Sequence, residues 1–349
     1  MTITAAIAGI GLNCPLGQGL DAVAAGYRNG RPNFVKSKRG PIGTDGAPVT
    51  LSSVIPFEEV RNFEVRLQQL FAGAVADLIS TTPIAVPVPL RLVVPAWLAK
   101  DALGAQLRGW IGETYCEQFG SVEILADGET VAVYELARGM RHVSEGHADR
   151  LVVGALDSFM APELLDLLAI QERILSKGKP HGLIPGEAAA LFMLAPMADE
   201  TREPMLGTMV SIFTGFEQED LNSPRGMIGK GLAKPLRQAF ESFVPERFLV
   251  DLNGERWRSE DIGFALSGAR MPDELLADFE TPIGLTGDCG AVNSLILAAL
   301  SLAPGTELAQ PNMADEEAMR GISVVSTSLW QGPRSVAVFQ SFHGRGSPT

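Results

Sequence analysis

The chain has 349 residues, a formal net charge of −13 and 46% hydrophobic residues. This length is enough for one two-lobed unit or for two domains, with a sizeable buried core. The negative charge argues against a nucleic-acid backbone or an anionic membrane surface as a partner. We expect no membrane span, because no run of about eighteen uninterrupted apolar residues occurs.

The three cysteines, Cys14, Cys116 and Cys289, lie far apart and form no paired motif. This spacing does not indicate a disulfide framework and favours a reducing compartment. The N-terminal residues have a short apolar run without a basic segment before it, so we interpret them as a first strand and not as a signal peptide. The cytoplasm is the location that these features predict.

The apolar pattern predicts strands and helices that alternate along the chain. The expected linker, residues 196–204, is polar and charged and divides the chain into halves at 1–199 and 205–349. Alternation of this kind implies mostly parallel sheets covered by helices. The first half is predicted to contain strand 3–10, helix 20–27, a loop-rich region 29–60, helix 63–79, strand 90–95, helix 103–116, strand 121–125, helix 133–143, strand 151–153 and a glycine-rich turn that leads into a strand within 180–194. The second half is predicted to contain strand 207–214, helix 229–243, strand 247–251, helix 258–266, strand 281–285, helix 290–302 and strands 321–327 and 335–341.

The glycines after the first strand suggest a dinucleotide-binding loop as a rival interpretation. The pattern G-x-G-x-x-G begins at Gly9 and Gly11, but Cys14 stands where the third glycine is required. This rival is therefore weak. The sequence also contains no phosphate-binding loop, no zinc ligand set, no G-x-S-x-G elbow and no C-x-x-C motif, so we expect no metal and no cofactor.

The stretch of residues 131–196 is the most informative part of the chain. Apolar residues recur at helical spacing from Val133 to Val143, and Gly146 follows where a glycine cap is expected. The words SEGHADRLVVGALDS and HGLIPGEAAALFML come next, and AIAGIGLNCPLGQGL opens the chain. These words resemble, in order and spacing, motifs of the β-ketoacyl-acyl carrier protein synthases, or ketosynthases, which have the thiolase-like fold. The resemblance implies an α/β protein with five αβαβα layers built from two similar halves.

The resemblance also implies where the catalytic Cys-His-His residues of the family should stand. Counting back from Gly146 places Glu129 at the position of the nucleophilic cysteine, at the start of a helix. The two histidine positions fall on Asp251, in DLNGE, and on Asp288, in GDCGAVN. A carboxylate does not form the same acyl-thioester, and an ionised aspartate does not polarise a thioester carbonyl. The resemblance therefore implies a member that lacks condensing chemistry.

A one-residue gap in this count would place Gly128 or Thr130 at the nucleophile position, and neither is a cysteine. The three carboxylates also have a structural interpretation, since Glu129 and Asp288 stand at predicted helix starts, where carboxylates serve as caps. The resemblance implies that Glu187 shapes the floor of the pocket, with a structural role favoured over a chemical one. The other pocket residues implied by the resemblance are Gly186, Asn253, Gly254, Cys289 and Gly332.

The remaining reactive side chains are weaker candidates. Cys289 neighbours Asp288 and precedes a predicted helix, where the pKa of a thiol could fall. We expect Cys116 to be buried and inert. The four histidines lie outside the three catalytic positions, and we expect none of them to be catalytic: His142, His147, His181 and His343.

Three functions remain open at this point. The first is a structural or acyl-carrier-recognising partner in a fatty acid or polyketide-type pathway, by analogy with chain-length-factor subunits that lack the cysteine. The second is an enzyme with altered chemistry that uses Glu129, Asp251 and Asp288 as acid and base. The third is a protein-interaction scaffold. A carrier-recognising or acyl-binding protein should keep an open tunnel to residue 129, whereas a scaffold should have it filled.

The partner expected from the resemblance is a second copy of the chain. The family pairs through the strand before the nucleophile helix, here residues 121–125, and an apolar edge strand left unpaired is an aggregation hazard. A heterodimer with an active synthase and binding of an acyl carrier protein are the other candidate partnerships.

Overall fold

The computed structural model describes residues 5–36, 42–43, 46–60, 62–127, 132–197, 205–219, 223, 226–269, 279–303, 321–329 and 332–342. In the first part of the chain the elements are β1 (Ala5–Cys14), β2 (Gly17–Gln18), α1 (Leu20–Arg28), β3 (Val35–Lys36), β4 (Thr50–Leu51), α2 (Phe63–Thr81), β5 (Val88–Pro95), α3 (Ala96–Lys100), α4 (Ala102–Thr114), β6 (Phe119–Asp127), α5 (Ala132–Ser144), β7 (Leu151–Ser158), α6 (Pro162–Ile170) and β8 (Glu187–Pro196). They are followed by β9 (Gly207–Glu217), α7 (Lys230–Ser242), β10 (Arg247–Val250), α8 (Arg256–Ala269), α10 (Ile283–Thr286), the 3₁₀ helix η1 (Gly290–Val292), α11 (Asn293–Leu302), β11 (Ile322–Ser328) and β12 (Gly332–Ser341).

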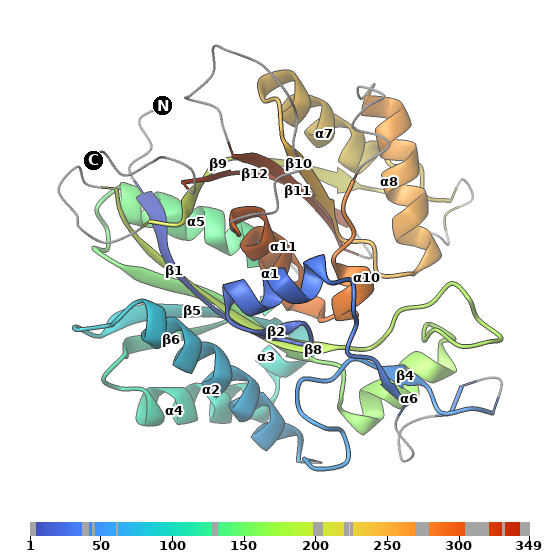
Figure 1. Ribbon diagram of the computed structural model, residues 1–349, viewed down its shortest axis with the longest axis horizontal. Helices are drawn as coiled ribbons and strands as arrows, with labels where there is room; N and C mark the ends of the chain where they lie inside the picture. Colours follow the sequence, from blue (N-terminus) through green and yellow to red (C-terminus); the bar gives the residue numbers. More distant parts are fainter. Residues whose placement is uncertain are drawn as a thin grey trace.

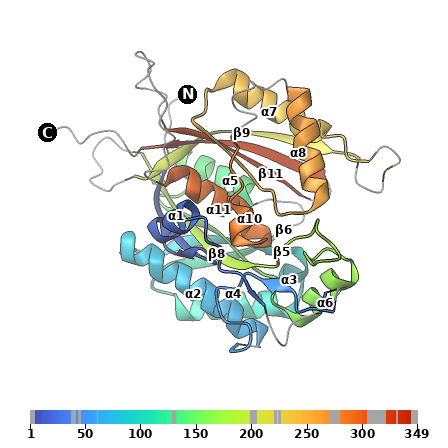
Figure 2. The same cartoon turned by 45° about the vertical axis from the view of Figure 1, so that its right-hand side comes forward.

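Helical and strand layers alternate through the molecule (Figure 1 and Figure 2). Helices α7 and α8 cover one outer face, and α2 and α4 cover the opposite one. Helices α5 and α11 pack against each other in the centre, between the strands β9 to β12 on one side and the remaining long strands on the other. The architecture is therefore the five-layered arrangement that the sequence words imply.

Nine strands in the described part of the chain form one continuous sheet in the order β10-β11-β12-β9-β1-β8-β7-β5-β6, β2 pairs with β1 beside it, and β3 and β4 form a separate two-stranded sheet. The two parts of the continuous sheet are joined through a single residue pair between β1 and β9, Ile7 with Gly207. The strand β6 ends the sheet at one edge, and β10 ends it at the other. The division of the chain into halves at 1–199 and 205–349 stays a prediction, and residues 198–204 lie outside the described residues.

The central helices form because their apolar residues recur on faces that both parts of the sheet bury. In α5, Val133, Leu136, Met140 and Val143 are buried in the same core as most of α11. The helix ends as expected: Gly146 adopts a φ of 73°, which glycine tolerates without strain. Two further cores lie beneath the outer helices, one under α2 and α4 and one under α7 and α8.

Three expectations about the elements were wrong. The sheet is mixed and not mostly parallel, because only β5-β6, β5-β7 and β10-β11 pair in parallel, whereas β8 runs antiparallel to both β1 and β7. The predicted strand 281–285 is instead the short helix α10. Two short helices, α3 and α6, lie where no element was predicted. No helix among the described residues is long and apolar enough to cross a membrane.

Candidate functional site

Asp251 lies where the chain leaves β10, and its side chain forms a buried ion pair. The residue is 7% exposed, and its Oδ2 accepts hydrogen bonds from Arg258 Nη1 and, at 2.8 Å, from the backbone N–H of Ser328. Arg258 Nη1 also donates to the Ser328 carbonyl at 2.7 Å. The guanidinium stacks 4.5 Å over the ring of Trp257, which is itself buried. Helix α8 and the end of β11 therefore hold Asp251 in one orientation.

Asp288 lies before η1 and accepts hydrogen bonds on both oxygens. Its Oδ1 accepts from Asn293 Nδ2 at 2.6 Å and from the Gly290 N–H at 2.9 Å, whereas the residue at the N-cap of η1 is Cys289, which makes no side-chain cap. Its Oδ2 accepts from Asn253 Nδ2 at 2.7 Å. The residue is 4% exposed, so all of its described partners lie inside the protein.

Glu255 connects this pair of aspartates to the surface. Asn253 Nδ2 donates to Glu255 Oε2 at 2.9 Å as well as to Asp288, and Trp257 Nε1 donates to the same Glu255 oxygen at 3.1 Å. Arg173, from the segment after α6, makes two bonds to the Glu255 carboxylate, at 2.7 and 3.1 Å. These residues therefore form one hydrogen-bonded network around Asp288, and the ring of Trp257, over which Arg258 stacks, joins it to the ion pair of Asp251.

The network contains three carboxylates, those of Asp251, Asp288 and Glu255, and two guanidinium groups, those of Arg173 and Arg258. Burial raises the pKa of Asp251, and the neighbouring Arg258 guanidinium lowers it less than burial raises it. Burial lowers the pKa of Arg258, but the carboxylates of Asp251, Asp288 and Glu255 together raise it above its ordinary value. Arg258 therefore remains a cation among three carboxylates, and burial, not repulsion between acids, is the main cause of the Asp251 shift.

A small cavity of about 30 Å³ lies beside Asp251 and Arg258. A site of this size accommodates about one water molecule, whose share of liquid volume is about 30 Å³. Two polar atoms of its lining, Arg258 Nε and Ser294 Oγ, are buried and have no protein partner. The other lining residues are Gly290, Ala291, Asn293, Thr327, Ser328 and Leu329.

Glu187 is buried at the start of β8 with four donors around it. Its Oε1 accepts from Arg66 Nη1 at 2.7 Å and from the N–H groups of Val54 and Ile55, each at 3.0 Å. Its Oε2 accepts from Ser158 Oγ at 2.8 Å. A carboxylate with every oxygen engaged and no exposed surface joins segments of the chain, which agrees with the structural role favoured for it.

Two expectations about the cysteines were wrong, one about the pKa of Cys289 and one about the burial of Cys116. Burial raises the pKa of the Cys289 thiol well above its ordinary value, so the expected fall at a helix start is wrong. Cys289 is fully buried, and its sulfur contacts the carbonyl oxygens of Thr286 and Gly287. Cys116, expected to be buried, is exposed, because it lies in the turn between α4 and β6.

Of the three glycines of the predicted pocket, Gly186 and Gly254 lie beside the network and Gly332 does not. The Gly186 N–H donates to the Asp288 carbonyl at 2.8 Å, and a β-carbon at this position would lie 3.0 Å from Cys289 Sγ. Gly254 has a φ of 96° beside the network. Gly332 packs against the ring of Phe216, where a β-carbon would lie 2.5 Å from a ring carbon, and it does not line the cavity beside Asp251.

Glu129, the third carboxylate of the hypothesis, lies outside the described residues, as do Gly128, Thr130 and His343. Among the described histidines, His142 and His147 lie together, with ring centroids 5.0 Å apart, and His181 is exposed. Within the described ranges, no group of three or more His, Cys, Asp or Glu side chains has the arrangement of a metal site.

Sequence reasoning did not identify Arg258, Glu255 or Arg173, although these residues decide the charge of the site. A signal was present in the words NGERWR, where Glu255 and Arg258 follow Asn253 at spacings of two and five residues. Arg173 could not be found in this way, because it lies 82 positions before its partner Glu255.

No family model matches the sequence, and no curated protein matches it. Solved structures do match. The ishigamide ketosynthase/chain length factor superposes with a TM-score of 0.71 at 18% identity, over 97% of this chain and 99% of that one. The AntDE:AntF complex, a type II PKS acyl-carrier protein with its ketosynthase bound to the hexaketide, superposes with a TM-score of 0.70 at 13% identity, over 97% of this chain and 100% of that one. The ketosynthase from module 6 of the bacillaene synthase of Bacillus subtilis 168 superposes with a TM-score of 0.69 at 13% identity, over 97% of this chain and 72% of that one. The chain therefore has the thiolase-like fold of the ketosynthases and chain length factors.

Proposed function

We propose that the protein is a ketosynthase-like partner without condensing activity, acting in a fatty acid or polyketide-type pathway in the cytoplasm. The observation that carries the proposal is the state of the two aspartates at the histidine positions. Asp251 is held by Arg258, and Asp288 is held by Asn253 and Asn293. Groups engaged in this way are not available to polarise a thioester carbonyl, which needs hydrogen-bond donors directed at the substrate oxygen.

The size of the cavity supports a structural partner over a carrier of acyl chains. A volume of about 30 Å³ is well below the roughly 300 Å³ or more of ordinary ligand pockets. In this proposal the protein recognises an acyl carrier protein or a synthase by its surface and does not hold an acyl chain beside Asp251. A scaffold function differs only in lacking carrier recognition.

The test is incubation of the purified protein with malonyl- and acyl-carrier substrates, with an active ketosynthase assayed in parallel. We expect no carbon–carbon bond formation above background. Addition of the protein to the active enzyme should change the rate or the product length, because a partner acts through its complex. Condensation by the protein alone would overturn the proposal, and no binding to the carrier or to the synthase would leave the scaffold function.

The proposed contact surface is the edge strand β6. It ends the sheet, and Val122, Ile124 and Leu125 on it are only partly buried. A strand of a second copy, or of an active synthase, can continue the sheet there and satisfy its free backbone groups. Light scattering at micromolar concentration should give the mass of a homodimer, and a stable monomer that also fails to bind a synthase would contradict this part of the proposal.

Altered chemistry is the second candidate, and the raised pKa of Asp251 favours it. A buried carboxyl group that holds its proton more tightly than usual can act as a general acid. This candidate requires a substrate to reach Asp251. Loss of a measured acyl-transfer or hydrolysis activity in Asp251→Asn, with the fold retained, is the result that would support it.

A further inference from the structure

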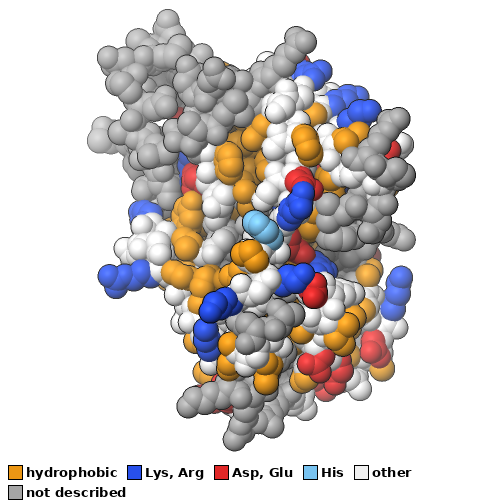
Figure 3. Space-filling view, turned by 90° about the vertical axis from the view of Figure 1, so that its right-hand side faces the viewer, with side chains coloured by type: hydrophobic (Ala, Val, Ile, Leu, Met, Phe, Trp, Pro, Cys, Tyr) orange, Lys and Arg blue, Asp and Glu red, His pale blue; other side chains and the backbone are white. Residues whose placement is uncertain are grey.

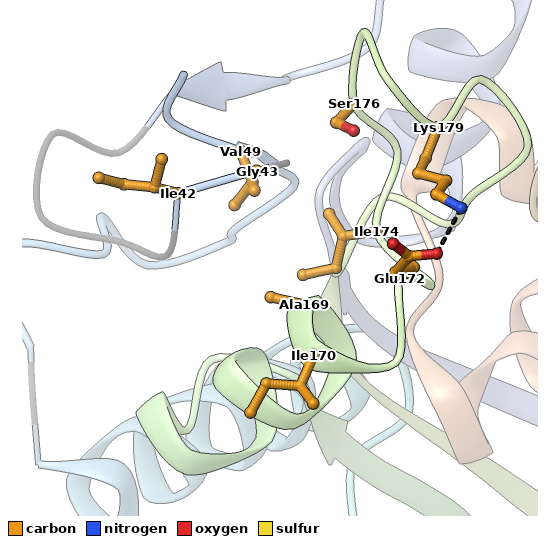
Figure 4. Close-up of a pocket in the computed structure, with 9 residues that line it drawn as sticks. All are labelled: Ile42, Gly43, Val49, Ala169, Ile170, Glu172, Ile174, Ser176 and Lys179. Carbon is orange, nitrogen blue, oxygen red and sulfur yellow. Dashed lines mark ion pairs between the residues drawn. The ribbon is translucent and has the colours of Figure 1, made fainter. Parts of the chain in front are cut away.

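A second cavity, of about 230 Å³, lies between Ile42, Gly43 and Val49 on one side and the end of α6 and the segment 172–179 on the other (Figure 4). It lies on the side of the molecule that faces the viewer in Figure 3, where hydrophobic, basic and acidic side chains are mixed and neither charge predominates. No part of its lining belongs to the network around Asp251. Its lining residues are Ile42, Gly43, Val49, Ala169, Ile170, Glu172, Ile174, Ser176 and Lys179.

The walls of this cavity are apolar and partly open to solvent. Ile42 is 64% exposed and Ile170 is 79% exposed, whereas Ile174 is buried at 4%. Leu167, one helical turn before Ile170 on α6, is also exposed. Branched aliphatic side chains grouped around a hollow leave apolar surface in water, and a small apolar group that fills the hollow removes that surface.

The rim of the cavity carries one ion pair, between Glu172 and Lys179 (Figure 4). The Glu172 side chain is 51% exposed and that of Lys179 is 41% exposed, so both heads can reach a ligand. Lys179 is held by a tight turn, because the N–H groups and carbonyls of Ser176 and Lys179 exchange two hydrogen bonds of 3.0 Å.

The backbone of Glu172 is unusual. Its φ is 55°, and no other residue with a β-carbon in the described part of the chain has a positive φ. The Glu172 N–H donates to the Ala169 carbonyl and the Arg173 N–H to the Leu168 carbonyl, each at 3.0 Å, so Glu172 occupies the helix-ending position at which glycine is preferred. A carboxylate kept in a strained conformation at a cavity rim indicates a use for that carboxylate.

We propose that this cavity binds a small apolar α-amino acid such as leucine. The ligand carboxylate would lie beside Lys179, its ammonium beside Glu172 and its side chain among Ile42, Ile170 and Ile174. Four alternating charges then form a neutral square on the rim, so neither protein charge loses its partner. A neutral ion pair complements a zwitterion better than it complements a carboxylate or an amine alone. The volume of about 230 Å³ is below that of ordinary ligand pockets, so only a small ligand of this kind fits.

The cavity also contacts the candidate site through one residue. Glu172 and Ile174 line the cavity, and Arg173 between them points the other way and pairs with Glu255. An amino acid bound to the rim is therefore one residue away from the network that holds Asp288. The binding proposal rests on the cavity alone and does not depend on the proposed function.

The test is calorimetric titration of the full chain with L-leucine. We expect saturable binding, and at least tenfold weaker binding for three analogues that each lack one group: 4-methylpentanoate, 3-methylbutylamine and glycine. Glu172→Gln and Lys179→Gln should each weaken leucine binding at least tenfold. Lys177→Gln is the matched control, because it removes a charge from the same turn without lining the cavity, and it should bind as the wild type does.

Three results would overturn the proposal. The first is no binding of leucine at millimolar concentration. The second is equal binding of 4-methylpentanoate or 3-methylbutylamine, which would mean that the rim does not recognise a zwitterion. The third is an equal loss of leucine binding in the Lys177→Gln variant, which would indicate a general electrostatic attraction of the ligand by the turn. All three substituted side chains lie on the surface or the rim, and circular dichroism would confirm that each variant is folded.

Discussion

The substitution Glu187→Gln tests whether the buried acid at the start of β8 is structural. Glutamine keeps one carbonyl oxygen, which can still accept from Arg66 and from the N–H groups of Val54 and Ile55. It loses the negative charge that faces Arg66, whose side chain is 2% exposed. Removing one partner of a buried ion pair costs about 3–5 kcal/mol, because the other charge stays buried.

The lower end of this range applies here. Arg66 also donates to the carbonyls of Ile55, Pro56 and Val60, so its guanidinium keeps polar partners when the charge of Glu187 is removed. We expect a loss of about 3 kcal/mol in the free energy of unfolding, which is a large part of the 5–15 kcal/mol typical of a folded domain. The control is Glu172→Gln, which breaks an ion pair of half-exposed side chains and should cost about 1 kcal/mol or less.

The assay is urea unfolding followed by circular dichroism, with midpoints compared at an unchanged slope. A loss for Glu187→Gln no larger than that of the control would refute the structural interpretation. It would mean that Arg66 is satisfied by its carbonyl acceptors alone and that the Glu187 charge is retained for another purpose.

Three further outcomes are expected. Burial raises the pKa of Asp251 in the folded protein above an unfolded value near 3.9, so the folded state holds more protons and the wild type loses stability as pH rises above about 4. The variant Asp251→Asn lacks this loss. Urea unfolding at several pH values should therefore show that the stability of the variant rises relative to that of the wild type as pH rises. Glu172→Gly should be more stable than Glu172→Gln, by up to about 1 kcal/mol, since both lose the ion pair with Lys179 and only glycine relieves left-handed strain of roughly 1–2 kcal/mol while the unfolded chain gains freedom. A lower thermal midpoint for Glu172→Gly than for Glu172→Gln would contradict this. A thiol reagent should label one cysteine in the native protein, Cys116, because it is exposed whereas Cys14 and Cys289 are buried. Burial also raises the pKa of Cys14 to about 12 and that of Cys289 well above its ordinary value. Labelling of Cys289 as fast as Cys116 would be inconsistent with the packing.

The sequence by itself determined most of the helices and strands, because their apolar periodicity is strong. Helices α1, α2, α4 and α5 begin and end within two residues of their expected limits, since each buries apolar residues on one face. The words around Gly146 and Gly186 also predicted the fold, because glycine is required where the backbone turns left-handed or where two segments approach closely.

Strand direction and the short elements needed the tertiary structure. Periodicity records which face of a strand is buried, but it does not record which neighbour the strand pairs with, so the antiparallel place of β8 between β1 and β7 could not be read from it. The segment 281–285 has the apolar residues of a strand, yet it is helical where the chain turns from Pro282 toward Asp288. Short apolar runs fit either state.

The candidate site, too, was predictable from the sequence only in part. The positions of Asp251 and Asp288 followed from the words around them. The tertiary structure pairs Asp251 with Arg258, seven positions later in the same segment, and brings in Arg173 from a segment 82 positions before its partner Glu255. An ion pair between distant residues depends on how the layers stack, and local sequence patterns carry no record of that stacking.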